Sequence, residues 1–125
     1  MRILLDTHIL YWWFYDRKQL SDAALRIVRE ADDVFVSSAS LWEMAIKIRI
    51  GKLNADIDRV IQQIRAARFE ELPIVYKHTQ PVATLPFHHN DPFDRLLIAQ
   101  ALSEPLRLLT TDTKLKPYSD LVVCV

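Results

Sequence analysis

The stretch "HHNDPFDRLLIAQA", residues 88 to 101, combines the start of a helix with two closely spaced carboxylates. Asp91 is a favoured N-cap residue, Pro92 is a favoured first helical residue, and apolar residues follow at helical spacing. Capping accounts fully for Asp91. It accounts for Asp94 only in part, because one cap is usually enough and the positive helix end is its only other local partner. Asp94 is therefore a candidate for a further function.

On both sides of this helix the chain alternates short apolar strands with helices. The strands are expected at residues 2–5, 34–36, 72–75, 106–112 and 121–125. The helices are expected at residues 7–15, 22–31, 40–50, 56–69, a short stretch after 75, and 92–102, with Gly51 as the stop of the third. Such alternation predicts right-handed crossovers and a mostly parallel sheet that is covered on both faces.

Composition limits the class of protein. The 125 residues are expected to form one domain, and 50% hydrophobic with 26% charged residues describes a folded globule. The 16 basic and 16 acidic residues cancel, which argues against tight non-specific electrostatic binding of nucleic acid. It does not exclude nucleic acid, because acids at a metal site would offset basic residues elsewhere.

Cysteine content and hydropathy point to the cytoplasm. The lone Cys124 excludes an internal disulfide, and the valines on both sides predict a buried strand position. No apolar run approaches the roughly 18 residues of a membrane span, and the short apolar run before Asp6 is not typical of a signal peptide. We expect a cytoplasmic protein without a membrane partner.

Four carboxylates occupy positions that a parallel sheet brings to one edge. Asp6 and Asp112 follow strands, whereas Glu43 and Asp94 lie near the starts of helices. The carboxyl ends of parallel strands, and the helices that follow them, meet at the same edge, where ligands bind in such folds. Each acid also has an ordinary explanation: a turn or cap for Asp6 and Asp112, pairing of Glu43 with Lys47, and the helix dipole for Asp94.

The convergence of four acids favours a metal site over these separate explanations. Unpaired carboxylates at one edge would repel one another, raise their pKa values and destabilise the fold. A divalent cation removes that cost, and a site rich in oxygen and free of sulfur suits Mg²⁺ or Mn²⁺. Such a cation would activate a water molecule for attack on a phosphodiester.

The motifs "LLDTHILYWW", "SLWE", "DPFDRLLIAQA" and "LLTTD" resemble a PIN domain, and in particular the VapC-like ribonuclease toxins of toxin–antitoxin pairs. The resemblance covers essentially the whole chain. It implies a three-layer α/β/α sandwich and an endoribonuclease that depends on Mg²⁺ or Mn²⁺. It also implies an RNA substrate, an antitoxin partner and a homodimer. Metal binding is assigned by the resemblance to Asp6, Glu43, Asp94 and Asp112.

Further residues receive weaker assignments. The resemblance places small hydroxyl residues near the site at Thr7 and Thr111, and Asp91 supports the metal ligands besides capping its helix. Arg95 contacts either a substrate phosphate or a neighbouring acid. The basic run of Lys47, Arg49 and Lys52 either follows an RNA backbone or is a solvated helix end. The histidines are expected in surface or packing positions: His8, His88 and His89.

The aromatic run "YWWF" at residues 11–14 is too large for one face of a small core. Neighbouring residues on a helix point about 100° apart, so part of the run is predicted to meet solvent or another chain. We expect Trp12 or Trp13 to take part in the dimer or antitoxin surface.

Three alternative functions remain open at this point. One is a PIN-like nuclease without an antitoxin. Another is a metal-dependent phosphatase, although that chemistry favours a second Asp two residues after Asp6, and position 8 is His. The third is a non-catalytic binding module, against which the complete set of four acids argues.

Overall fold

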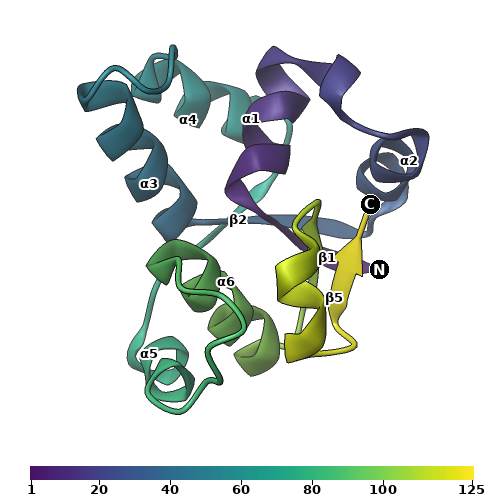
Figure 1. Cartoon of the computed structure of the whole chain (residues 1–125). Coiled ribbons are helices and arrows are strands. Elements are labelled where there is room, and N and C mark those ends of the chain that lie inside the picture. The colour runs from purple at the N-terminus through teal and green to yellow at the C-terminus, as the bar shows by residue number, and fades with distance from the viewer.

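The computed structural model describes residues 1–125 and contains a five-stranded, fully parallel sheet (Figure 1). The strand order is β3-β2-β1-β4-β5, so the chain begins at the centre of the sheet, builds one half and then crosses back to build the other. The strands are β1 (Arg2–Leu5), β2 (Asp33–Ser37), β3 (Glu70–Leu72), β4 (Arg107–Thr110) and β5 (Val122–Cys124). The predicted parallel α/β fold is confirmed.

Helices cover both faces of the sheet, as a three-layer sandwich requires. Figure 1 shows α1, α2, α3 and α4 on one side of the sheet and α5 and α6 on the other. The helices are α1 (Thr7–Tyr15), α2 (Asp22–Glu30), α3 (Ser38–Arg49), α4 (Ile57–Ala66), α5 (Tyr76–Val82) and α6 (Pro92–Ser103), with short 3₁₀ helices η1 (Arg17–Gln19) and η2 (Thr113–Tyr118). None of the helices combines the length and apolar character that crossing a membrane requires.

Two apolar cores lie on the two faces of the sheet. Side chains alternate between faces along a strand, so Ile3 and Leu5 of β1 enter the core under α1, whereas Leu4 enters the core under α6. All three are fully buried, as expected for the central strand of a parallel sheet. This packing fixes β1, and with it the residue that follows, Asp6.

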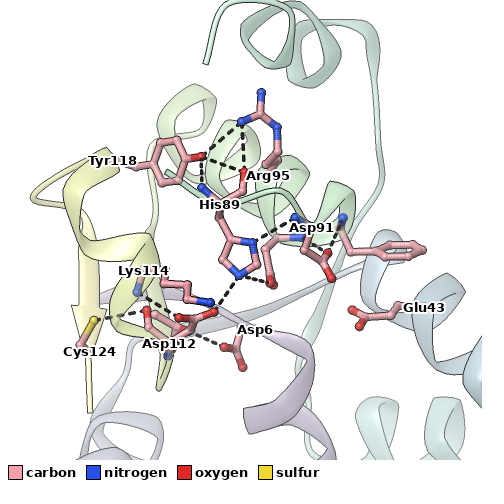
Figure 2. A network of polar contacts seen from close by, with 12 residues as sticks. Asp6, Glu43, His89, Asp91, Arg95, Asp112, Lys114, Tyr118 and Cys124 are labelled. Carbon is pink, nitrogen blue, oxygen red and sulfur yellow. Dashed lines mark hydrogen bonds and ion pairs between the residues drawn. The ribbon is translucent and has the colours of Figure 1, made fainter. Parts of the chain in front are cut away.

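Two local expectations are wrong. The third strand ends at Leu72 instead of beginning there, because Pro73 cannot donate to a strand partner. Cys124 is a free, exposed cysteine, since β5 lies at the edge of the sheet where one side of the strand has no neighbour. Figure 2 shows its sulfur near Asp112. Flanking valines therefore did not indicate burial at position 124.

The start of α6 agrees with the prediction. Oδ1 of Asp91 accepts hydrogen bonds from the backbone N–H groups of Phe93 and Asp94 at 2.8 and 3.0 Å, and Pro92 is the first helical residue. This cap sets the side chain of Asp94 in the first turn, at the carboxyl edge of the sheet.

Candidate functional site

Asp6 lies at the centre of the site, held between β1 and the start of α1. Its Oδ1 accepts a hydrogen bond from the Ile9 N–H at 2.9 Å, and its Oδ2 accepts one from the Thr110 hydroxyl. The side chain is only 3% exposed. Burial raises the pKa of Asp6, the nearby Glu43 raises it further, and the hydrogen bonds from Thr110 and Ile9 offset only part of the rise. Asp6 is thus a rigid carboxyl with no cation in contact.

Glu43 extends from the second turn of α3 and has one oxygen without a partner. Its Oε2 accepts a hydrogen bond from Lys47 Nζ at 2.7 Å, whereas its Oε1 is buried and unpaired. The residue is 5% exposed, and Figure 2 shows its carboxylate directed toward Asp6. A buried acceptor left without a partner costs about 1–3 kcal/mol. The pairing with Lys47 suggested by the sequence is present, but it satisfies only half of the carboxylate.

The pKa of Asp94 reflects its burial and the short distances between the acids. Burial raises the pKa of Asp94 to about 7, and repulsion from Asp91, Asp6 and Glu43 adds to the rise. Only His89 acts in the opposite direction. Asp91 is a neighbour on the same helix, but Asp6 and Glu43 come from distant parts of the chain, so their repulsion of Asp94 is a product of the fold.

His89 joins two of the acids through a single nitrogen. Its Nε2 lies 2.8 Å from Oδ2 of Asp112 and 3.5 Å from Oδ2 of Asp94. Its Nδ1 accepts a hydrogen bond from the Asp91 N–H at 3.0 Å, so the hydrogen of a neutral ring is on Nε2 and is donated to Asp112. Figure 2 shows the ring between Asp91 and Asp112. The expectation of a surface or packing role is wrong for His89.

Asp112 follows β4 and caps η2. Its Oδ1 accepts a hydrogen bond from the Lys114 N–H at 3.0 Å. Partial burial works to raise the pKa of Asp112, but the hydrogen bonds from Lys114 and His89 outweigh it and lower the pKa. Asp112 therefore ionises easily, whereas the raised pKa of the neighbouring Asp94 favours its protonated form.

The donors of this site suit a hard divalent cation. The ligand atoms of His89, Asp94 and Asp112 lie within 4.8 Å of one another, and Asp6 and Glu43 add two further carboxylates around them. Oxygen donors predominate, no thiolate is present, and the unpaired Oε1 of Glu43 needs a positive partner. We call Asp6, Glu43, Asp94 and Asp112 the acidic cluster.

The family model of the PIN domain matches residues 3–121 of the chain. The chain belongs to the PIN-domain family. Ribonuclease VapC22 of Mycobacterium tuberculosis is 30% identical over 119 residues, which are 93% of this chain and 91% of that protein. The family predicted from the sequence motifs is confirmed.

Solved structures share the fold of this PIN domain at lower identity. VapBC2 from Rickettsia felis, bound to a DNA fragment, has a TM-score of 0.70 at 18% identity and covers 100% of this chain and 98% of that chain. FitAcB from Neisseria gonorrhoeae has a TM-score of 0.67 at 19% identity and covers 98% and 96%. At these identities the likeness establishes the three-layer fold.

Two hydroxyl residues were expected near the site of this PIN domain. Thr7 directly follows Asp6 and donates to Ser40 Oγ at 3.0 Å, whereas Thr111 is exposed. Thr110 takes the expected place, because its buried Oγ1 donates to Asp6 and accepts from the Asp112 N–H at 3.0 Å. β4 ends at Thr110, so Thr111 lies beyond the strand, where the pleat no longer sets the direction of a side chain.

Arg95 is a structural residue and not a phosphate contact. It is 6% exposed, and its guanidinium donates to the carbonyl oxygens of Val82, Leu85 and Pro86 at 2.8–3.3 Å. It also donates to the hydroxyl of Tyr118 at 3.2 Å (Figure 2). These bonds fasten the loop before α6, and with it His89, to the helix. Both sequence hypotheses for Arg95 are wrong.

The residues of the basic run after Glu43 differ in exposure, and so do those of the aromatic run on α1. Arg49 and Lys52 are exposed and form no ion pair, whereas Lys47 is engaged by Glu43. Trp13 belongs to the core, which excludes it from a surface, and Trp12 is half-buried. The most exposed tryptophan is Trp42 on α3, at 59%.

Proposed function

We propose that this PIN domain is a metal-dependent endoribonuclease that acts as the toxin of a toxin–antitoxin pair. The observation on which the proposal rests is the acidic cluster: four carboxylates from distant parts of the chain share one edge of the sheet without enough cations to balance them. A ribonuclease relative that spans nearly the whole chain supports RNA as the substrate.

The proposed ligands of Mg²⁺ or Mn²⁺ are Asp6, Glu43, Asp94 and Asp112. Such an ion, when bound, polarises a phosphoryl oxygen and lowers the pKa of a water molecule. The chain prepares each ligand in advance. Lys47 fixes one oxygen of Glu43 and leaves the other free, and the hydrogen bonds of Asp6 hold its carboxyl in place.

His89 has a positioning function in this proposal. Its Nε2–H holds Oδ2 of Asp112, while the Asp91 N–H holds its own Nδ1, so the ring cannot rotate without losing both bonds. Asp91 therefore supports the site in two ways, because its carboxylate starts α6 and its backbone orients His89.

We also propose an antitoxin partner, a homodimer and a cytoplasmic location. Several solved structures with this fold are complexes, among them VapBC from Salmonella typhimurium bound to DNA and a toxin–antitoxin complex from Klebsiella pneumoniae. A second copy or an antitoxin would also cover large apolar side chains that are now exposed, such as Trp42 and Ile46.

The proposal is tested with purified protein and a single-stranded or looped RNA. Cleavage is expected with Mg²⁺ or Mn²⁺ and should stop on addition of EDTA. The Asp112→Asn variant, purified in the same way, controls for contaminating nucleases. RNA cleavage that persists in EDTA, or that is equal in the variant, would contradict the proposed mechanism.

A further inference from the structure

A cleft of about 280 Å³ opens between α1 and α3 beside the acidic cluster. Two of its lining residues, Thr7 and His8, directly follow Asp6, and a third, Met44, directly follows Glu43. Both helices lie on the same side of the sheet (Figure 1). Lys47, which also lines the cleft, donates to Glu43 at 2.7 Å, so the cleft adjoins this acid of the cluster.

One wall of the cleft is cationic. Lys47 and Lys52 both line it, but only Lys47 is engaged by an acid, since Lys52 is exposed and forms no ion pair. Gly51, the only glycine of the chain, has a φ of +76°, a conformation that other residues adopt only with strain. This turn lets the N–H groups of Lys52 and Leu53 donate to the Lys47 carbonyl at 2.8 and 3.1 Å, which places the two lysines together.

The other wall is aromatic and apolar. Tyr11 lines the cleft, and its ring is stacked on Tyr15 with a centroid distance of 5.0 Å. Met44 and Leu53 complete the apolar surface. An aromatic ring and an unpaired ammonium group that line the same cleft match a nucleotide, in which a base stacks on the ring and a phosphate meets the cation.

We propose that this cleft binds the nucleotide next to the scissile phosphate on one side of the cleaved bond, with Lys52 at its phosphate and Tyr11 at its base. The inference rests on the proposed ribonuclease function and adds to it a direction for the RNA strand. The acidic cluster repels a polyanion, and the chain has no net positive charge, so a local cation is needed where the strand leaves the site.

The test measures binding of a fluorescent single-stranded oligoribonucleotide in EDTA, where hydrolysis is off. Lys52→Gln should weaken binding about fivefold at 0.1 M salt and reduce the slope of log affinity against log salt by about 0.7, as expected for one lost phosphate contact. Tyr11→Leu should weaken binding about tenfold through lost stacking, and Tyr11→Phe should restore it. Lys18→Gln, at an exposed lysine of η1 without an ion pair, is the matched control and should bind normally.

Shortened oligonucleotides show which end of the RNA strand occupies the cleft. Removing nucleotides from one end should abolish the difference between wild type and Lys52→Gln, whereas removal from the other end should preserve it. With Mg²⁺, Lys52→Gln should raise KM more than it lowers kcat. Lys47 is unsuitable for this test, because it also holds Glu43.

The results of these experiments distinguish failure of the nucleotide cleft from failure of the proposed ribonuclease function. If the wild type cuts RNA and the Lys52 and Tyr11 variants bind it normally, the cleft is not a nucleotide site, but the ribonuclease proposal stands. If the wild type neither binds nor cuts RNA, both are wrong. If an oligoglutamate peptide, but not RNA, depends on Lys52, the cleft recognises an acidic protein segment and the inference is overturned.

Discussion

Asp94 has the clearest electrostatic cost in the molecule. Its pKa of about 7, raised mainly by burial and then by three neighbouring acids, means that the folded protein without metal keeps a proton that the unfolded chain releases above pH 4. The stability that this proton provides is complete below about pH 4 and is lost as the pH rises toward 7. A residue retained at such a cost has the character of a functional ligand.

Replacing Asp94 by Asn should therefore separate function from stability. We expect RNA cleavage to be lost, while thermal unfolding in EDTA at pH 8 shows a variant more stable than wild type by on the order of 1 to 3 kcal/mol. The advantage should shrink at pH 5, where the wild-type carboxyl is still protonated in the folded state. A variant that is less stable at both pH values, or that still cuts RNA, would contradict this assignment.

In the proposed site, the ring of His89 orients Asp112 through its Nε2. We expect His89→Gln to fold normally and to raise the Mn²⁺ concentration needed for half-maximal cleavage about tenfold or more, as is usual when a partner of a metal ligand is removed. His88→Gln is the matched control, because the neighbouring ring is exposed and packs edge-on against Tyr118, with 4.9 Å between centroids. Equal metal dependence of the two variants would exclude the positioning role.

The start of α6 depends on Asp91, which supplies the cap that the local sequence predicts. Asp91→Ala should lower the free energy of unfolding by about 0.5–2 kcal/mol, and Asp91→Asn, which keeps a capping oxygen, by much less. Urea denaturation measures both. RNA cleavage should survive in the folded Ala variant, since the Asp91 N–H that orients His89 belongs to the backbone. Loss of cleavage in Asp91→Ala with cleavage intact in Asp94→Asn would mean that the two roles are reversed.

A polar contact joins the start of α5 to the C-terminal end of α6, the end opposite to Asp94. His78 is buried on α5, its Nδ1 accepts the Val75 N–H at 3.1 Å, and its Nε2 bonds to Glu104 at the end of α6. The hydrogen bond from His78, together with Lys77 at 3.2 Å, lowers the pKa of Glu104. This contact stabilises the fold above the ordinary pKa of Glu104, and the stabilisation is lost as the pH falls below about 4.5.

Glu104→Gln should flatten this pH dependence. At pH 7 the variant is expected to be about 1 kcal/mol less stable than wild type, because a charge-assisted hydrogen bond becomes a neutral one, and the difference should vanish toward pH 3. Urea midpoints between pH 3 and 7 measure the effect. Glu30→Gln, at an exposed glutamate of α2 without an ion pair, should follow the wild-type curve. A difference that is independent of pH would contradict the assignment.

The acidic cluster links four elements that come together only in the folded chain: the ends of β1 and β4 and the early parts of α3 and α6. A divalent cation bound there has no equivalent site in the unfolded state, so binding should stabilise the whole fold. Mn²⁺ or Mg²⁺ at about one hundred times its dissociation constant should add about 2.7 kcal/mol.

This stabilisation is measured as an increase of Tm with metal concentration. Asp94→Asn should show a much smaller increase, and NaCl at equal ionic strength should leave the wild-type Tm nearly unchanged. An equal response of wild type and variant to Mn²⁺ would show that the ion binds elsewhere.

Local chemistry was sufficient for much of this architecture. The helical spacing after Pro92, the cap at Asp91 and the short apolar runs each predicted an element that the structure contains. The meeting of Asp6, Glu43, Asp94 and Asp112 could also be predicted, because parallel strands joined by helices all end at one edge. The spacing of apolar residues and the right-handed crossover between parallel strands are set by local chain geometry, and neither depends on the path of a loop.

The partners of these acids depended on the tertiary structure. His89 reaches Asp112 because Arg95 ties the preceding loop to α6, and an irregular loop has no period from which that path can be predicted. Thr110 meets Asp6 because it is the last residue of β4, where packing of the sheet sets the direction of its side chain, whereas Thr111 lies beyond the strand. Distances between residues far apart in the chain are decided by packing, so the residues that tune the site become visible only in the folded molecule.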